Sequence, residues 1–268
     1  MSRPRAPQPT SGPRSLAPRE HGAYGQLVFP LATALASARP HAAAWSLATA
    51  AVLVFLAHEP WLVATGRRGR RATEDDGPRA RRRLLQLGLF AAAFGLTGLA
   101  LAPPAARLAS LGAGALAVLV GWVAAQGKER TLGGELLASL AFASGAVPVA
   151  LASGLPLEAA ARLGALWLVA FTATTVGVRA VATPPSRRTR LGSVLPLPTL
   201  LALLPIAFFC APHGPGGTGE PAALALVVAS LGLVLARPSV RHMKRIGWSL
   251  VAASVAVALL VAYDTWGG

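Results

Sequence analysis

The chain places two titratable side chains, His58 and Glu59, inside an otherwise apolar stretch that runs from Ala42 to Gly66. Adjacent imidazole and carboxylate groups can exchange protons, coordinate an ion or contact a polar headgroup. If the stretch crosses a membrane and Arg67 marks the surface, a rise of about 1.5 Å per residue puts the pair on the order of 13 Å deep. Titratable groups at that depth are costly and indicate a functional site. The alternative is a Glu59–arginine ion pair that only joins two helices.

A second polar segment precedes the first apolar stretch. It contains Glu20, His21, Tyr24 and Gln26, with small glycines between them that let a backbone approach a neighbour. We predict that these four side chains bind a ligand. The alternative is an ordinary interfacial helix start, with Glu20 near the positive end of the helix dipole and Tyr24 in the aromatic belt.

A third polar segment joins two apolar stretches around Lys128, and Glu135 lies about one turn into the second of them. Thr131 followed by Glu135 also fits a helix cap with an acid in the first turn. This ordinary structural interpretation is strong for Glu129 and weaker for Glu135. Arg179, near the end of a later stretch, can pair with Glu59 or Glu135, receive an anion or extend to the surface.

These segments define the candidate site. We predict His58, Glu59 and Glu135 as acid/base groups or metal ligands. Neither a metal nor a cofactor can be identified, because no histidine elsewhere has a partner at metal-ligand spacing and Cys210 is the only cysteine. The predicted ligand-binding residues are Glu20, His21, Tyr24, Gln26, Arg67, Arg68, Lys128 and Arg179.

The composition indicates the environment that must position these side chains. Of 268 residues, 54% are hydrophobic and 13% are charged, whereas soluble domains carry about 25% charged residues. The net charge of +15 would suggest a nucleic-acid partner in a soluble protein. Here the cations lie in short runs between apolar segments and no nucleic-acid-binding module is recognisable, so we expect membrane lipids as partners and no nucleic acid.

Nine apolar segments are long enough to be candidate transmembrane helices, and together they predict an all-α, polytopic membrane bundle. Residues 1–19 are rich in proline, serine and arginine and lack the apolar core of a signal peptide, so we predict a disordered basic cytoplasmic tail and a single membrane domain over residues 20–268. The segments are Ala23–Ala38, Ala42–Gly66, Leu84–Ala102, Leu108–Gln126, Leu132–Gly154, Leu157–Ala182, Ser193–Ala211, Pro221–Ala236 and Ile246–Asp264.

The distribution of cations supports this topology. With nine helices and a cytoplasmic N-terminus, 22 of the 25 lysines and arginines fall on the cytoplasmic side, and only Arg39, Arg107 and Arg162 fall outside. Short cytoplasmic loops are enriched in Lys and Arg, and a wrong helix count would scramble the alternation. We therefore expect a multi-pass protein of the cytoplasmic membrane whose polar site faces the cytoplasm.

The motifs carry a family resemblance. The run Arg19-Glu20-His21-Gly22-Ala23-Tyr24-Gly25-Gln26, with His58-Glu59-Pro60-Trp61 and Gly66-Arg67-Arg68-Gly69, resembles the YwiC-like family of bacterial membrane proteins. The layout is also similar to that of the UbiA-type intramembrane prenyltransferases, whose nine helices carry catalytic loops on the cytoplasmic side. Those enzymes hold Mg²⁺ and a diphosphate through two Asp-rich motifs. This chain has His58-Glu59 at the first position and no acid at the second, which Arg179 and Thr183–Arg190 occupy.

Three classes of function fit these observations. One is a divergent membrane enzyme or lipid-binding protein that takes an isoprenoid or another anionic lipid, with Arg179 as the anion-binding group. Another is a transporter or proton pathway through His58, Glu59 and Glu135, which the near absence of titratable residues in the outer halves disfavours. The remaining class is a non-catalytic membrane scaffold or assembly factor.

Overall fold

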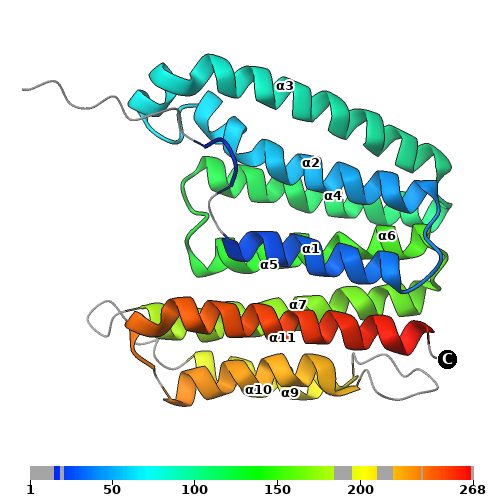
Figure 1. The fold of residues 1–268 in the computed structure, drawn as a ribbon, viewed down its shortest axis with the longest axis vertical. Helices are drawn as coiled ribbons and strands as arrows, with labels where there is room; N and C mark the ends of the chain where they lie inside the picture. The colour runs from blue at the N-terminus through cyan, green and yellow to red at the C-terminus, as the bar shows by residue number, and fades with distance from the viewer. Residues whose placement is uncertain (1–14, 19–20, 184–194, 210–219, 237, 267–268) are drawn as a thin grey trace, which may run out of the picture.

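The computed structural model describes residues 15–18, 21–183, 195–209, 220–236 and 238–266. Almost all of them are helical, and the helix axes run roughly along one direction (Figure 1). The helices are α1 (His21–Ala36), α2 (Ala42–Ala64), α3 (Arg70–Leu101), α4 (Pro104–Ala125), α5 (Leu132–Ser144), α6 (Ala146–Ala152), α7 (Leu157–Ala182), α9 (Pro196–Phe209), α10 (Glu220–Ala236), the 3-10 helix η2 (Val240–His242) and α11 (Met243–Trp266).

The predicted polytopic α-helical bundle is confirmed, and each of the nine predicted segments overlaps a helix in the described part of the chain. Six helical segments are long and apolar enough to cross a membrane: α2, α3, α4, α5 with α6, α7, and η2 with α11. Helices α1, α9 and α10 have 16, 14 and 17 residues, short of the roughly 20 that a perpendicular span needs. They nevertheless lie alongside the long helices, with α1 packed on α11 and α10 on both α7 and α9.

The start predicted for the third helix is wrong. Residues 70–83, expected to form a loop, belong to α3, which has 32 residues. Arginine and glutamate are good helix formers, and Arg70 pairs with Glu74 one turn later. Pro78 lies inside this helix, where the missing N–H favours a bend. The charged part of α3 is therefore a helical extension that carries its own buried side chains.

Small residues bring the helices close together. Leu47 of α2 packs so tightly against Gly98 of α3 that a β-carbon there would lie 2.8 Å from the leucine side chain. Gly177 of α7 meets the backbone and side chain of Ser230 in α10 in the same way. Such close approach through small residues is typical of helices packed in lipid. At the centre of the bundle, the fully buried Trp167 donates a hydrogen bond to Thr33 Oγ1 over 2.8 Å.

The fifth predicted segment divides at Gly145 into α5 and α6. Pro148, in the first turn of α6, has no N–H for the carbonyl of residue 144, so the continuous helical ladder is interrupted there. The two helices still form one apolar segment, Leu132–Ala152, that is long enough to span a membrane.

One end of the bundle gathers the basic segments, and we call it the basic end. The start of α1, the α2–α3 and α4–α5 connections, the end of α7 and the start of α11 all lie there (Figure 1). Residues 15–18 of the predicted tail reach the same end, where Leu16 is buried against Val63 and Ala80. The rest of the predicted tail lies outside the described residues, so its disorder stays a prediction.

Candidate functional site

A large cavity of about 1240 Å³ separates two groups of helices. Helices α2, α3 and α4 contribute one side of its lining, and α1, α5, α7 and α11 contribute the other. Most of the lining side chains are apolar or small, including Leu47, Phe55, Leu99, Ala117 and Phe142. The cavity therefore offers a long apolar surface inside the bundle.

The titratable side chains that line the cavity all belong to the basic end. They come from the last part of α2, the α2–α3 turn, the first part of α3, the α4–α5 loop, the first turn of α5 and the last turn of α7. We call this set the charged cluster. Its members are His58, Glu59, Arg68, Asp76, Glu129, Arg130, Glu135 and Arg179.

The α2–α3 turn carries Arg68 back over the end of α2. The N–H of Arg67 bonds to the carbonyl of Leu62, and that of Gly66 bonds to Val63, which is a Schellman helix end. It requires a left-handed residue, and Gly66 has φ of +79°; Gly69, which ends the turn, has φ of +94°. The two glycines thus reverse the chain and direct the arginine toward the helix it has just left.

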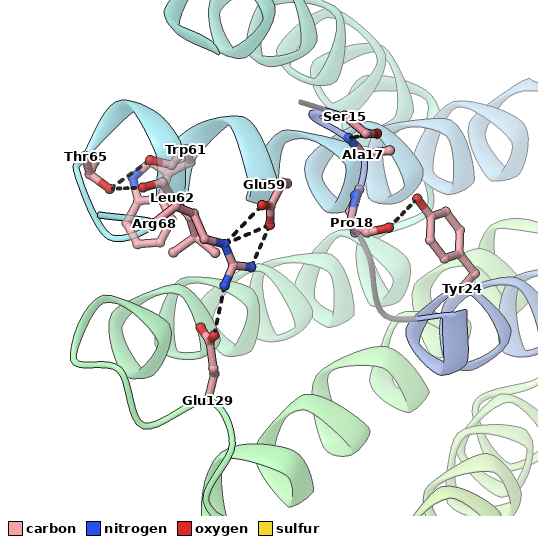
Figure 2. Close-up of polar contacts among 10 residues, drawn as sticks. All are labelled: Ser15, Ala17, Pro18, Tyr24, Glu59, Trp61, Leu62, Thr65, Arg68 and Glu129. Atoms are coloured by element: carbon pink, nitrogen blue, oxygen red, sulfur yellow. Dashed lines mark hydrogen bonds and ion pairs between the residues drawn. The ribbon is translucent and has the colours of Figure 1, made fainter. Parts of the chain in front are cut away.

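Arg68 holds two carboxylates from different segments (Figure 2). Its Nη2 lies 2.6 Å from Glu59 Oε2 and its Nε lies 3.0 Å from Glu59 Oε1, a bidentate contact. Its Nη1 reaches Glu129 Oε1 at 3.4 Å. The Glu59 side chain is 6% exposed, against 30% for Arg68 and 27% for Glu129. A buried carboxylate needs such a partner, because desolvating an unpaired charge is costly.

The α4–α5 loop is built with the same local geometry. Lys128 N–H bonds to Val123 O and Gly127 N–H bonds to Ala124 O, so α4 also ends in a Schellman motif with Gly127 at φ of +69°. The loop then folds onto the start of α5. A β-carbon on Gly134 would lie 2.4 Å from the Lys128 carbonyl oxygen and 2.9 Å from that of Glu129. The backbone of Glu129 can therefore pack against the start of α5 only because Gly134 has no side chain.

A second ion pair lies beside the first. Arg179 Nη1 of α7 lies 2.8 Å from Glu135 Oε2 and also bonds to the backbone oxygen of Arg130 at 3.2 Å. Thr131 caps α5 by accepting the N–H of Gly134, which confirms the predicted cap and the acid in the first turn. Both side chains of this pair are more than a third exposed, 37% and 35%. The Arg179–Glu135 pair is thus the more accessible one.

The other predicted site residues are placed as follows. Gln26 lines the cavity, whereas Tyr24 donates its hydroxyl to the Pro18 carbonyl and meets Phe55 edge-on at 5.0 Å. Arg67 and Lys128 are exposed and do not line the cavity. His21 is the first residue of α1, and Glu20 lies outside the described residues. Predicted residues from α1, α2, the α2–α3 turn, α5 and α7 therefore converge on one cavity.

Three residues of the charged cluster are not among the predicted site residues: Asp76, Glu129 and Arg130. The sequence indicates an ordinary turn charge for Glu129, yet its carboxylate accepts a hydrogen bond from Arg68. Asp76 falls in the loop expected between the second and third segments, yet its side chain is only 8% exposed and lines the cavity. The recurrence of Ala72, Asp76 and Ala80 at four-residue intervals, all buried, was the available signal, because that spacing marks one face of a helix.

The carboxylates of the cluster do not fit a magnesium–diphosphate pair of the prenyltransferase type. Such a site needs several carboxylate oxygens free to coordinate a hard cation. Glu59, Glu129 and Glu135 are instead bonded to guanidinium groups. Within the described ranges, no group of three or more histidine, cysteine, aspartate or glutamate residues could hold a metal ion.

Comparison with known proteins supplies one match. The family model described as YwiC-like protein matches residues 17–151, about half of the chain. This stretch covers the helices from α1 to α6 and includes Glu59, Arg68, Asp76 and Glu129 of the charged cluster. No curated protein and no solved structure gave a match. The chain belongs to the YwiC-like family.

Proposed function

We propose that this membrane protein binds one amphipathic membrane lipid with a phosphate-bearing headgroup. The apolar part of the lipid occupies the cavity and the headgroup lies at the charged cluster. The observation that carries the proposal is the continuity of the cavity, in which one volume of about 1240 Å³ joins the apolar surface to the charged side chains at one end.

The dimensions of the cavity suit a long molecule. Its lining on α2 extends from Val63 to Leu47 and on α4 from Ala124 to Ser110, which at about 1.5 Å per residue corresponds to roughly 20–24 Å along the helix axes. The volume exceeds the ~300–1000 Å³ of usual small-molecule sites. A hydrocarbon chain of a lipid fills such a space, and each buried methylene contributes about 0.8 kcal/mol.

The headgroup end offers guanidinium groups, which bind phosphate with paired N–H donors. Arg68, Arg130 and Arg179 all line the cavity. By the positive-inside rule, the basic end faces the cytoplasm, so the bound headgroup belongs to the cytoplasmic leaflet. This orientation suits a protein of the bacterial cytoplasmic membrane that captures a lipid from the inner surface.

Two other functions receive less support from the cavity. An ion pathway needs polar groups along its length, whereas the titratable residues that line the described cavity lie at its basic end alone. Acid/base catalysis by Glu59 or Glu135 requires a carboxylate free to contact a substrate, whereas both are bonded to arginines. Lipid binding uses the apolar and the charged lining together.

A cavity-filling variant tests the proposal. Gly114 lines the cavity and has no atom within 4 Å of the position of an added β-carbon, so Gly114→Phe places a ring in the lipid space. Gly112, on the same helix with the same open surroundings, does not line it, which makes Gly112→Phe the matched control. Native mass spectrometry of the detergent-purified protein counts retained lipids. We expect one tightly retained lipid in the wild type and the control and its loss in Gly114→Phe; equal retention in both variants would refute the proposal.

The headgroup contact has its own matched pair of variants. Arg179→Gln removes an arginine that lines the cavity, and Arg162→Gln removes one that pairs with Glu158 on the same helix, away from the cavity. We expect the retained lipid to dissociate at lower collision energy in Arg179→Gln alone. Equal dissociation energies in the two variants would exclude Arg179 from the headgroup site.

A further inference from the structure

The charged cluster has an unusual charge balance for this protein. The chain carries 25 cations and 10 acids, yet the cavity is lined by four carboxylates and three guanidinium groups. A site built only for an anion would concentrate the abundant arginines around it. Instead, four of the ten acidic residues of the chain line the cavity beside three arginines, so the cluster is close to neutral in a strongly basic protein.

Internal pairing accounts for most of these charges. Glu59 and Glu129 share Arg68, and Glu135 pairs with Arg179. Among the cavity-lining charges of the described chain, Arg130 and Asp76 are left without a partner inside the cluster. Arg130 is exposed at the cavity edge, and its backbone oxygen, rather than its guanidinium, takes part in the Arg179 contact.

Asp76 is the more informative of the two. Its side chain is 8% exposed and its nearest cation is Arg79 Nη1 at 3.7 Å, which is beyond hydrogen-bond distance. Arg79 itself is half exposed and does not line the cavity. No hydrogen bond to the Asp76 carboxylate occurs within the described residues. A buried carboxylate that accepts no hydrogen bond costs free energy. Because Asp76 faces the cavity, its oxygens can accept hydrogen bonds from a cationic group of a ligand bound there.

Resting on the lipid-binding function proposed above, we propose that the headgroup is zwitterionic: its ammonium group binds Asp76, and its phosphate binds Arg130 and the adjacent Arg179. The lipid class is an aminophospholipid, such as one with a phosphoethanolamine headgroup. Arg68 ties the turn before α3, the helix of Asp76, to Glu129, the neighbour of Arg130. Asp76 and Arg130, the two charges without a partner inside the cluster, therefore belong to segments that Arg68 joins, and both line the cavity.

The test measures two lipids with identical acyl chains, phosphatidylethanolamine and phosphatidylglycerol, on the delipidated full-length protein by native mass spectrometry. Both carry a phosphate and only the first carries an ammonium. A charge-assisted hydrogen bond contributes about 1.5–3 kcal/mol, so we expect a preference for phosphatidylethanolamine of roughly tenfold or more. Asp76→Asn should bring the ratio of the two dissociation constants close to one, while Asp76→Glu should keep the preference.

Asp75→Asn is the matched control, because Asp75 is the exposed neighbour on the same helix and does not line the cavity. It should bind both lipids as the wild type does. Circular dichroism and size-exclusion chromatography verify that each variant is folded. Equal affinity of the wild type for the two lipids, or an unchanged preference in Asp76→Asn, would overturn the zwitterionic headgroup alone. If neither lipid binds, or if Gly114→Phe binds both as the wild type does, the lipid-binding function itself fails.

Discussion

The two ion-pair groups at the basic end are built from the same residue types but differ in burial. Glu59 is 6% exposed and accepts hydrogen bonds at both carboxylate oxygens from one guanidinium, which also reaches Glu129. The Arg179–Glu135 pair has a single contact of 2.8 Å, and both side chains are more than a third exposed. The first group lies where two loops meet, and the second joins α5 to α7 at the cavity edge.

This difference in burial indicates different roles for the two groups: the Arg68 group stabilises the structure, and the Arg179–Glu135 pair can exchange its carboxylate for a ligand. A buried, bidentate pair is expensive to break, because its partner is left charged and desolvated. An exposed pair of one contact contributes about 0–1 kcal/mol, so a phosphate can replace its carboxylate at low cost. We therefore assign Arg68 mainly to holding the cavity end together and Arg179 mainly to contacting the headgroup.

The largest effect is expected for Glu59→Gln. It leaves Arg68 with Glu129 as its only carboxylate partner of the cluster. Breaking a buried pair costs about 3–5 kcal/mol when the remaining charge is uncompensated, so with Glu129 still in place we expect the lower end, about 3 kcal/mol. The free energy of unfolding, measured by equilibrium denaturation in detergent, should fall by about that amount. Glu74→Gln is the control, since Glu74 also pairs with an arginine but is 60% exposed. Equal losses in the two variants would contradict a structural role for the buried pair.

The next effect concerns the loop that presents Glu129. Gly134→Ala forces a methyl group against the backbone oxygens of Lys128 and Glu129, and overpacking of this kind costs about 1–3 kcal/mol. Gly133, one residue earlier, has nothing within 4 Å of an added β-carbon. Gly133→Ala should therefore be neutral or stabilising, because alanine favours helix. Equal unfolding free energies for the two variants would show that the loop does not depend on this close approach.

A smaller effect on stability is expected for Arg179→Gln. Because its pair is more than a third exposed, we expect the unfolding free energy to fall by less than about 1 kcal/mol, while lipid retention falls clearly. For Glu59→Gln we expect the reverse: a large fall in the free energy of unfolding and a smaller change in lipid retention. A large loss of stability in Arg179→Gln, with lipid retention unchanged, would invert the roles of the two groups.

The smallest effect is expected for Arg70→Gln in the charged part of α3. Arg70 is 91% exposed and its partner Glu74 is 60% exposed. Such i, i+4 pairs contribute about 0.2–0.5 kcal/mol to helix stability. The same denaturation measurement should place this variant within error of the wild type. A loss near that of Glu59→Gln would mean that exposed charges of α3 also stabilise the bundle.

The sequence predicted the helical membrane bundle and much of the site, because apolar length and titratable residues at depth are local signals. His58, Glu59, Glu135 and Arg179 all line the cavity as part of the charged cluster. Hydropathy did not predict the start of α3, because the charged residues 70–83 are helical without being apolar. Hydropathy also could not identify Arg68 as the partner of Glu59. The α2–α3 turn directs Arg68 back toward α2 only because Gly66 and Gly69 adopt positive φ angles.

The lipid-filled cavity is tested most directly by photo-crosslinking the full-length protein in vesicles with a phospholipid that carries a photoreactive group at the end of one acyl chain. Helix α4 has two faces that distinguish the outcomes: Ala113, Ala117 and Val120 line the cavity, whereas Leu111 and Val118 are exposed on the outside of the bundle. A lipid held in the cavity predicts crosslinks to the first set that disappear in Gly114→Phe and persist in Gly112→Phe. Crosslinks confined to Leu111 and Val118, unchanged by either variant, would contradict it.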